Sequence, residues 1–368
     1  MRKSALLWFG LVTAALVALG LIVLSSASGA NGIRLHTDVY YFMKRQFLYL
    51  AVAVVTAIAM AAFDYRHWRD HWFLTAVFYV VVVVLLGAVF GFREINGSHR
   101  WISLGPVRLQ PSELAKLVTV IAVAVWTDKA GWKVELFLRG ALAPAMIVGG
   151  LAALVIAEPD FGSTMVILCV GFLVMFVSGT KFLHLCVFAG IGLAGFAGLL
   201  LSNANRIMRL TSEKALYQVN QALIAFKNGG LFGVGLGESM QKEYYLPEAH
   251  TDFIFAIGAE ELGLVFTLSV ILLFAAFFAL SIYIARKASD RFGRFLVIGM
   301  TFIIFFQAMF NFGVVCKALP TKGMALPFFS YGGTNLISAF FAVGTILSVG
   351  IHSYRDTKRS VRRNVFVN

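Results

Sequence analysis

The sequence carries little charge: Asp, Glu, Lys and Arg make up 13% of its 368 residues, while 60% of the residues are hydrophobic. A soluble domain carries roughly 25% charged residues, so this composition excludes one. Cysteine is also scarce. The three cysteines, Cys169, Cys186 and Cys316, lie in apolar stretches without metal-type spacing, which argues against a disulfide framework or a cysteine metal site.

The sequence is instead rich in long apolar runs. Runs of roughly 17–25 residues can cross a bilayer as helices. We therefore expect an all-α polytopic membrane protein, a single domain over residues 1–368, with ten spans at about 5–26, 46–63, 71–92, 112–127, 139–157, 162–178, 182–202, 253–285, 293–316 and 333–352. All six tryptophans fall at or near the ends of these spans, where their amphipathic rings prefer to lie.

Basic residues gather on one side of this topology. The segments that share a side with both termini hold 17 Lys and Arg against 6 Asp and Glu, whereas the rest of the chain holds 14 against 12. The positive-inside rule then predicts cytoplasmic termini and a large extracytoplasmic loop, residues 202–252, between the seventh and eighth spans. The net charge of +13 needs no nucleic acid to explain it, and we expect the basic tail, residues 353–368, to contact anionic membrane lipids.

The large outer loop has a recognisable pattern. Apolar residues at helical spacing predict an amphipathic helix over about residues 212–227, lying on the outer leaflet. Five glycines then fall within residues 229–237. Backbone N–H groups of such a segment could cradle a phosphate, or the segment could form a tight re-entrant turn. The pattern leaves both interpretations open.

Ionisable residues follow this loop where it enters the next span. Asp252 closes the segment 247–252 (PEAHTD), directly before an apolar run. A carboxylate at that position can ionise and still reach a lipid headgroup, which suits a substrate that is polar at one end and apolar at the other. Glu113 and Lys116 stand at i,i+3 at the start of the fourth span, where they could form a helix-surface ion pair or serve a headgroup or a catalytic network.

Several long motifs, in order along nearly the whole chain, resemble one family. The sequence is similar to the SEDS proteins (shape, elongation, division and sporulation) at residues 100–102 (RWI), 110–113 (QPSE), 247–255 (PEAHTDFIF), 260–263 (EELG) and 326–333 (LPFFSYGG). Within the family it looks most like the division member, because of residues 25–28 (SSAS), 41–46 (YFMKRQ) and 319–323 (LPTKG). It departs from the family pattern at Glu158, Lys317 and residues 334–335 (TN).

The resemblance implies a peptidoglycan glycosyltransferase of the bacterial cytoplasmic membrane that polymerises lipid II on the outer face, for septal synthesis. Asp252 matches the essential aspartate of the family and would act as the base in an inverting displacement of undecaprenyl diphosphate. The implied partners are a class B penicillin-binding protein that acts as transpeptidase, together with regulators of division. A divalent cation on the diphosphate is compatible with the sequence, although no ligand cluster demands one. Candidate substrate-binding residues are Arg100, Glu113, Lys116, Lys242, Glu248, His250, Lys322, Ser330 and Tyr331.

The sequence is also compatible with other functions. A lipid II flippase would also be polytopic, but a transport path should place ionisable groups through the middle of the bilayer, where this sequence has few. A scaffold that only recruits a division partner would not need the cluster of Glu248, His250 and Asp252. The elongation and sporulation members of the same family are further alternatives.

Overall fold

The computed structural model describes residues 3–29, 32–33, 37–92, 94, 98–104, 107–201, 213–320 and 323–367. These residues form a helical bundle with one small hairpin. The α-helices are α1 (Lys3–Ala27), α3 (Tyr41–Ala62), α4 (His67–Asp70), α5 (Trp72–Ala88), α6 (Pro111–Ala130), α7 (Ala143–Ala157), α8 (Phe161–Ser178), α9 (Phe182–Leu201), α11 (Glu213–Gly229), α12 (Ile254–Arg286), α13 (Arg291–Val315) and α14 (Gly333–Val367). Short 3-10 or π segments are η1 (Val89–Gly91), η2 (Gly131–Glu135), η3 (Phe137–Leu142) and η4 (Gln241–Tyr245). Strands β1 (Ile102–Leu104) and β2 (Val107–Leu109) pair antiparallel.

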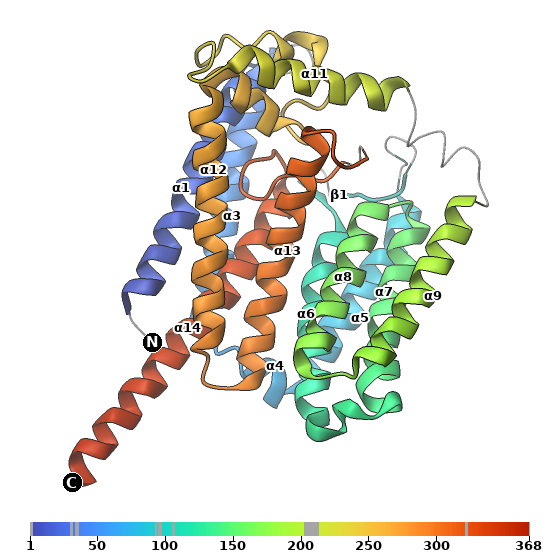
Figure 1. The fold of residues 1–368 in the computed structure, drawn as a ribbon, viewed down its shortest axis with the longest axis vertical. Coiled ribbons are helices and arrows are strands. Elements are labelled where there is room, and N and C mark those ends of the chain that lie inside the picture. Colours follow the sequence, from blue (N-terminus) through green and yellow to red (C-terminus); the bar gives the residue numbers. More distant parts are fainter. Residues whose placement is uncertain are drawn as a thin grey trace.

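Eight of the described helical segments are long and apolar enough to cross a membrane: α1, α3, α5 with η1, η3 with α7, α8, α12, α13 and α14. Helix α6 falls short because Glu113, Lys116, Asp128 and Lys129 interrupt its apolar stretch. In α9, the apolar helical segment among the described residues is Phe182–Gly192, which is shorter than a full span. Both helices run beside the others in the bundle (Figure 1). The chain is therefore a multi-pass membrane protein, and the number of ten spans and their sidedness remain predictions.

The bundle has two ends that differ in structure (Figure 1). Helix α11 lies across one end, called here the α11 end, and helix α4 lies at the other, called the α4 end. The start of α1 and the end of α14 both lie toward the α4 end, where α14 continues as a helix beyond the bundle. Helix α13 sits between two groups of helices and packs against α6 and α8 on one side and α12 and α14 on the other.

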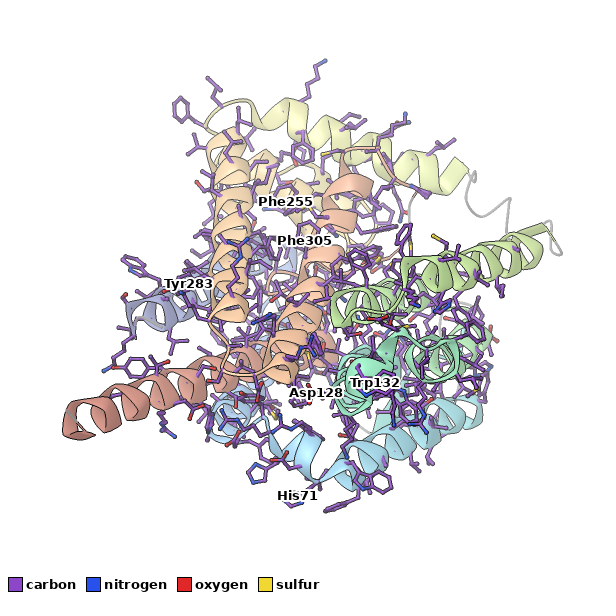
Figure 2. All side chains as sticks on the ribbon, turned by 60° about the horizontal axis from the view of Figure 1, so that its bottom comes forward. His71, Asp128, Trp132, Phe255, Tyr283 and Phe305 are labelled. Atoms are coloured by element: carbon purple, nitrogen blue, oxygen red, sulfur yellow. The ribbon has the colours of Figure 1, made fainter. Side chains whose placement is uncertain are left out.

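Aromatic and polar side chains mark the α4 end. Figure 2 shows His71, Asp128 and Trp132 at this end, and Phe255 far from it, in the part of the molecule nearest α11. Trp132 is 75% exposed in the segment that follows α6. An exposed indole beyond the apolar part of a helix agrees with a place at the membrane–water interface.

Helix α12 is broken near its start. Gly263 has φ 74° and ψ −165°, which is not helical and which glycine alone adopts readily. The first segment, residues 254–262, lies near the α11 end, and residues 264–286 form the long segment that crosses the bundle. The long segment measures about 34 Å at a rise of about 1.5 Å per residue, enough to span a bilayer. The sequence predicted one uninterrupted span from residue 253, and the glycine break divides it.

The glycine-rich segment closes this break with its backbone. The amides of Val234 and Gly235 donate to the carbonyls of Glu260 and Glu261, both at 3.0 Å, and the amide of Leu264 donates to the carbonyl of Gly230 at 3.0 Å. These carbonyls and this amide have no helical partners at the break, so the loop satisfies them. A Cβ atom on Gly233 would lie 2.1 Å from the Glu261 carbonyl oxygen, which explains the glycine. The geometry is that of the re-entrant turn, and the alternative phosphate cradle is not supported because these amides are already used.

Helix α11 covers nearly the same residues as the predicted amphipathic helix. Its apolar residues Val219, Ala222 and Ala225 are buried, and the helix packs against α12. Residues of its other faces, such as Tyr217, are exposed. This packing fixes α11 over the end of the bundle where the segment 247–252 also lies.

Candidate functional site

Asp252 lies in the loop that enters the first segment of α12. Asn311 of α13 donates its Nδ2 to the Asp252 backbone carbonyl and to the Met324 carbonyl, each at 2.8 Å. One amide therefore ties the loop before α12 to the loop before α14. Gly323 is so near that a Cβ atom there would lie 2.7 Å from Asp252 Oδ2. The backbone at Gly323 thus forms one wall around the Asp252 carboxylate.

The surroundings of Asp252 hold its proton tightly. Burial, with a smaller effect from the negative charge of Glu248, raises the pKa of this carboxyl to about 7 against the opposing charge of the Arg100 guanidinium. Asp252 lies outside the membrane-spanning segment of α12. A carboxyl group with a pKa near the working pH can take a proton from a hydroxyl group and release it again, as a general base must.

Arg100 is the cation that connects the polar groups of this region. Its Nη2 donates to the carbonyl of Pro159 in the connection between α7 and α8. Its positive charge acts on three carboxyl groups, those of Asp252, Glu158 and Asp160. Its Nε is buried and has no hydrogen-bond partner among the described residues. Arg100 therefore has a free donor beside three acidic groups.

Asp160 is the most highly connected of these three acids. Its Oδ1 accepts from the amide of Ser163 at 3.2 Å and so caps α8, while its Oδ2 accepts from Gln110 Nε2 and Ser112 Oγ, both at 3.1 Å. Burial works to raise the pKa of Asp160, but Arg100, the hydrogen bonds from Ser163 and the charge of Lys116 outweigh it and hold the pKa below its ordinary value. Asp160 stays ionised. Asp160 does not stand out in the sequence, because its partners Gln110 and Ser112 lie about 50 positions away in the chain.

Glu158 is buried in a different state. Its side chain is fully buried, and neither carboxyl oxygen has a hydrogen-bond partner among the described residues. Burial, with a smaller effect from the neighbouring Asp160, raises the pKa of Glu158 to about 8 against the opposing charge of Arg100. Two acids only two residues apart thus differ in charge at neutral pH, since Asp160 is ionised and Glu158 is protonated.

Glu113 and Lys116 form a buried ion pair at the start of α6. Lys116 Nζ lies 2.7 Å from Glu113 Oε1, and Ser338 of α14 donates to Glu113 Oε2 at 2.9 Å. Lys116 is 1% exposed and Glu113 6%. Of the two interpretations left open by the sequence, the ion pair exists, but it is buried rather than on a helix surface. The charge of Lys116 also acts on Asp160, which links the pair to the site.

The segment 248–251 and the turn at residues 330–332 hold each other in place. Ser330 Oγ donates to the Thr251 carbonyl at 2.6 Å and accepts from the Leu326 amide at 2.7 Å. The Tyr331 amide donates to the His250 carbonyl at 3.0 Å. Ser330, a predicted substrate contact, is 1% exposed and uses its hydroxyl group for these internal bonds. It supports the loop that carries Asp252.

Glu248 and His250 precede Asp252 in the same loop. Glu248 has φ 58° and accepts from Thr251 Oγ1 at 3.1 Å. The His250 ring lies 4.8 Å from the Phe42 ring and 5.9 Å from the Tyr331 ring. Burial lowers the pKa of His250, although Glu248 opposes the shift, so the imidazole is neutral at pH 7.

Lys242 lies apart from these groups. Its Nζ is 2.8 Å from Glu261 Oε1, 2.8 Å from Ser26 Oγ and 2.5 Å from the Gly237 carbonyl oxygen. Its three donors are thus used, and its side chain is buried. These contacts fix the outer loop to α1 and α12, and the diphosphate contact expected of Lys242 stays a prediction. Lys322, another predicted contact, lies outside the described residues, although its neighbour Gly323 borders Asp252.

The arrangement combines a base, several cations and a neutral acid at one end of the bundle. Asp252 can accept a proton, while Arg100 and Lys116 supply positive charge to a departing anion. Among the described residues, no group of three or more His, Cys, Asp or Glu side chains is placed to hold a metal ion. A proton acceptor beside fixed positive charge is compatible with proton removal coupled to departure of an anion.

Comparison with known proteins agrees with this chemistry. The profile of the FtsW/RodA/SpoVE family, described as "Cell cycle protein", matches residues 6–355. The probable peptidoglycan glycosyltransferase FtsW of Coxiella burnetii is 36% identical over 93% of this chain and 95% of its own length. Stage V sporulation protein E of Bacillus subtilis is 38% identical, covering 93% of this chain and 96% of that protein. A solved structure titled "Structural coordination of polymerization and crosslinking by a peptidoglycan synthase complex" matches 94% of this chain and 97% of its own, with 27% identity and a TM-score of 0.74. The chain belongs to the FtsW/RodA/SpoVE (SEDS) family and is a peptidoglycan glycosyltransferase of the bacterial membrane.

Proposed function

We propose that this glycosyltransferase polymerises lipid II on the outer face of the cytoplasmic membrane, with Asp252 as the general base. The observation that carries the proposal is the environment of Asp252, whose pKa of about 7 suits proton removal at neutral pH. The acceptor sugar's 4-hydroxyl group loses its proton to Asp252 as its oxygen attacks the anomeric carbon of the donor. Undecaprenyl diphosphate leaves from the opposite side, so the configuration at that carbon inverts.

Cations at the α11 end suit this leaving group. Arg100 and Lys116 lie in the site, and Lys322 precedes the glycine that borders Asp252. Positive charge that stabilises the diphosphate more strongly as it departs lowers the barrier of the step. A divalent cation bound to the diphosphate itself would act in the same direction.

A septal role in cell division, with a class B penicillin-binding protein and regulators of division as partners, completes the proposal. The FtsW names among the curated relatives support the division role, while the similar identity to a sporulation protein keeps the sporulation member as the alternative. The matched structure of a synthase complex that couples polymerisation to crosslinking supports a transpeptidase partner.

A lipid II flippase is less well supported. The buried charged residues of the described chain are Glu113, Lys116, Glu158, Asp160, Lys242, Glu260 and Glu261. Most gather around the site or the loop next to it. A transport path would require ionisable groups through the middle of the spans, which this distribution does not provide.

One assay tests the activity directly. The purified chain is mixed with its cognate class B penicillin-binding protein and labelled lipid II, and the products are separated on a gel. We expect ladders of glycan strands, which Asp252→Asn abolishes. Ladders of equal intensity from both proteins would remove Asp252 from the mechanism, and transbilayer movement of lipid II without ladders would favour the flippase.

A second assay tests the topology on which the proposal depends. In a background without native cysteines, Glu238→Cys in the exposed outer loop should react with an impermeant maleimide in intact spheroplasts, and Asn368→Cys should not. The reverse pattern would place the site in the cytoplasm and overturn the proposal. Asn228 is less suitable for the label, because its Nδ2 donates to Glu260 at 3.1 Å.

A further inference from the structure

Residues 230–237, called here the apolar loop, are exposed at the α11 end of the bundle. Leu231 is 62% exposed and Phe232 82%, and Val234 and Leu236 are exposed as well. The sequence has no charged residue in this loop. Leucine, valine and phenylalanine are residue types that are usually buried, and several of them exposed together mark a surface that contacts a partner.

Backbone hydrogen bonds fix the apolar loop to α12. The amides of Leu264 and Val265 donate to the carbonyls of Gly230 and Leu231, at 3.0 and 3.3 Å. The backbone of the loop is therefore held at the start of the long segment of α12, while the side chains of Leu231 and Phe232 stay exposed. Their exposure belongs to an ordered loop with a set position on the helix.

The apolar loop continues a lipid-facing surface of α12. This helix is long and apolar enough to cross a membrane. Its long segment has exposed apolar side chains at helical spacing, which places them on one face: Leu264, Val265, Leu268 and Leu272. Exposed apolar side chains on a spanning helix contact acyl chains. Because Leu231 is bonded to Val265, the apolar surface of the loop joins the lipid-facing surface of the helix.

The length of α12 gives the depth of the apolar loop in the bilayer. The helix ends in charge at Arg286 and Lys287, and Ala285 is the last residue before this charge. A hydrocarbon core of about 30 Å corresponds to about 20 residues at a rise of about 1.5 Å per residue. Counted back from Ala285, the core extends to about Val265. The side chain of Leu231 therefore lies near the boundary between headgroups and acyl chains.

The charge pattern favours lipid over protein as the partner of this loop. Lys227 precedes the loop and Glu238 follows it, and both are exposed. Apolar side chains flanked by charged ones suit a segment that lies in the membrane interface, with its apolar groups among acyl chains and its charged groups at the headgroups. A second copy of the chain would also cover apolar side chains, but it would not explain why they continue a lipid-facing helix surface.

We propose that the apolar loop inserts Leu231 and Phe232 into the acyl chains of the leaflet at the α11 end and anchors the outer loop on the membrane. The loop is also bonded to the first segment of α12, which begins two residues after Asp252. The anchor therefore fixes the height of the Asp252 loop relative to the bilayer. This contact with lipid is separate from the proposed reaction.

Site-directed spin labelling tests the contact. In a background without native cysteines, a nitroxide is attached to each of the variants Leu231→Cys, Phe232→Cys, Glu238→Cys and Leu272→Cys, and the full chain is placed in nanodiscs of zwitterionic lipid. Power saturation measures collisions of the nitroxide with oxygen, which concentrates in acyl chains, and with a water-soluble nickel chelate. Leu272 on the face of α12 is the membrane control, and Glu238 in the same outer loop is the water control. Thermal unfolding shows that each labelled variant is folded.

We expect the ratio of oxygen to nickel collisions at Leu231 and Phe232 to be severalfold higher than at Glu238 and close to that at Leu272. A ratio equal to that at Glu238 would place the loop in water and overturn the proposal. Few collisions with either reagent would show that protein covers the loop, which would overturn it as well. The measurement needs neither substrate nor turnover, so its result is independent of whether the chain polymerises lipid II.

Discussion

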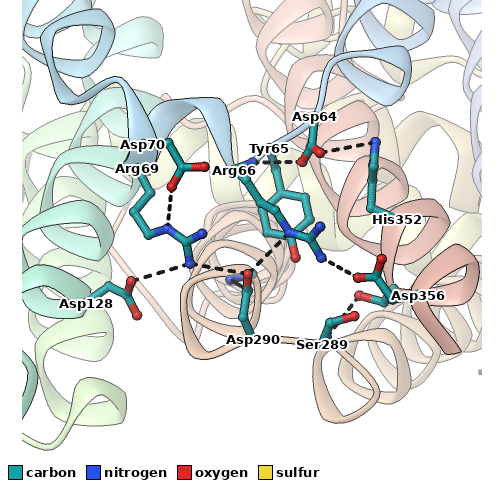
Figure 3. Close-up of polar contacts among 12 residues, drawn as sticks. Asp64, Tyr65, Arg66, Arg69, Asp70, Asp128, Ser289, Asp290, His352 and Asp356 are labelled. Atoms are coloured by element: carbon teal, nitrogen blue, oxygen red, sulfur yellow. Dashed lines mark hydrogen bonds and ion pairs between the residues drawn. The ribbon is translucent and has the colours of Figure 1, made fainter. Parts of the chain in front are cut away.

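The two ends of the bundle both carry charged clusters, but they use charge differently. At the α4 end, Arg66 and Arg69 form ion pairs with aspartates, and the His352 ring lies beside Asp64 (Figure 3). The contacts are Arg66 with Asp290 at 3.5 Å and with Asp356, Arg69 with Asp70 at 2.9 Å, Asp290 at 3.4 Å and Asp128 at 3.8 Å, and His352 with Asp64 at 3.7 Å. This network joins the α3–α4 connection, α6, the α12–α13 connection and α14, and its members are partly exposed.

At the α11 end several charged groups are buried, and the charges are unequally matched. Among the residues that the structure describes, neither carboxyl oxygen of Glu158 has a hydrogen-bond partner, and neither has the Nε of Arg100. The pKa of Asp252 is raised to about 7, chiefly by burial. Paired, half-exposed charges hold segments together, while buried groups kept from ideal pairing are expected where chemistry occurs. The contrast supports a structural role for the α4 cluster and the proposed catalytic role for the groups at the α11 end.

The contrast is strongest at Asp252. Asp252→Asn removes the base but keeps the shape of the side chain, so the rate of glycan synthesis should fall by about 10²–10⁴-fold. Thermal unfolding should change little, since the packing contact with Gly323 remains. The measurement is the initial rate of ladder formation per folded molecule. A rate within about threefold of wild type would contradict the functional assignment of this cluster.

Lys116 tests whether the buried ion pair belongs to structure or to function. Lys116→Met leaves Glu113 buried without its partner, which should cost about 3–5 kcal/mol of unfolding free energy. The double change Glu113→Gln with Lys116→Met should recover most of that stability, measured by thermal or denaturant unfolding in detergent. Turnover should stay low in the double variant, because the charge that acts on Asp160 is absent. Recovery of full turnover would make the pair purely structural.

The pH dependence of the reaction should report the state of Asp252. The base must be ionised, so kcat/KM should rise about tenfold per pH unit below pH 7 and level off above it. Arg100→Gln removes a charge that lowers the pKa of Asp252, and the midpoint should therefore move to higher pH, whatever the absolute rate. A midpoint that does not move would separate Arg100 from Asp252.

Glu158 should affect stability in a pH-dependent way. Its pKa is about 8 in the folded chain and near 4.5 when unperturbed. The free energy of unfolding is therefore highest below about pH 4.5, where Glu158 is protonated in both states, and falls as the pH rises toward 8. Glu158→Gln stays neutral throughout. The variant should unfold several degrees above wild type at pH 8 and within error of it near pH 4.5, as scanning fluorimetry can show. Equal melting temperatures at both pH values would mean that Glu158 is ionised.

The α4 end should give the smallest effects. Asp356→Asn removes one partner of a partly exposed arginine, which still has Asp290, so the loss should be about 0.2–1 kcal/mol and should shrink at high salt. Turnover per folded molecule should match wild type. A large loss of turnover would show that the two ends are coupled, which would contradict a purely structural role for the α4 cluster.

The sequence predicted those features that depend on local composition. Apolar length located eight helices that can cross a membrane, and helical spacing located α11. The motif ending in Asp252 also stood out, because an acid beside an apolar run is visible without a fold. Helix α6 shows the limit, since the Glu113 and Lys116 that interrupt its hydropathy are stabilised by burial against Ser338, a residue more than two hundred positions later.

Contacts between distant segments could not be predicted in this way. Lys242 resembles any other loop lysine until Glu261 and Ser26 are seen beside it. Asp160 acquires its role from Arg100 and Gln110, and the glycines of residues 229–237 acquire theirs from the broken backbone at Gly263. In each case the residue type is compatible with several functions, and the partner selects one.

The contact between Lys242, Glu261 and Ser26 also bears on how the chain is made. Ser26 leaves the ribosome 216 residues before Lys242, a delay on the order of 10–40 s at usual rates of synthesis. The two charged members are only 19 residues apart, so each emerges within a few seconds of the other. Helix α1, which is synthesised first, contributes only the Ser26 hydroxyl group to this contact. An unpaired hydroxyl group costs less free energy than an unpaired charge. Because Lys242 and Glu261 are synthesised within seconds of each other, neither charge is without its partner for long in the nascent protein.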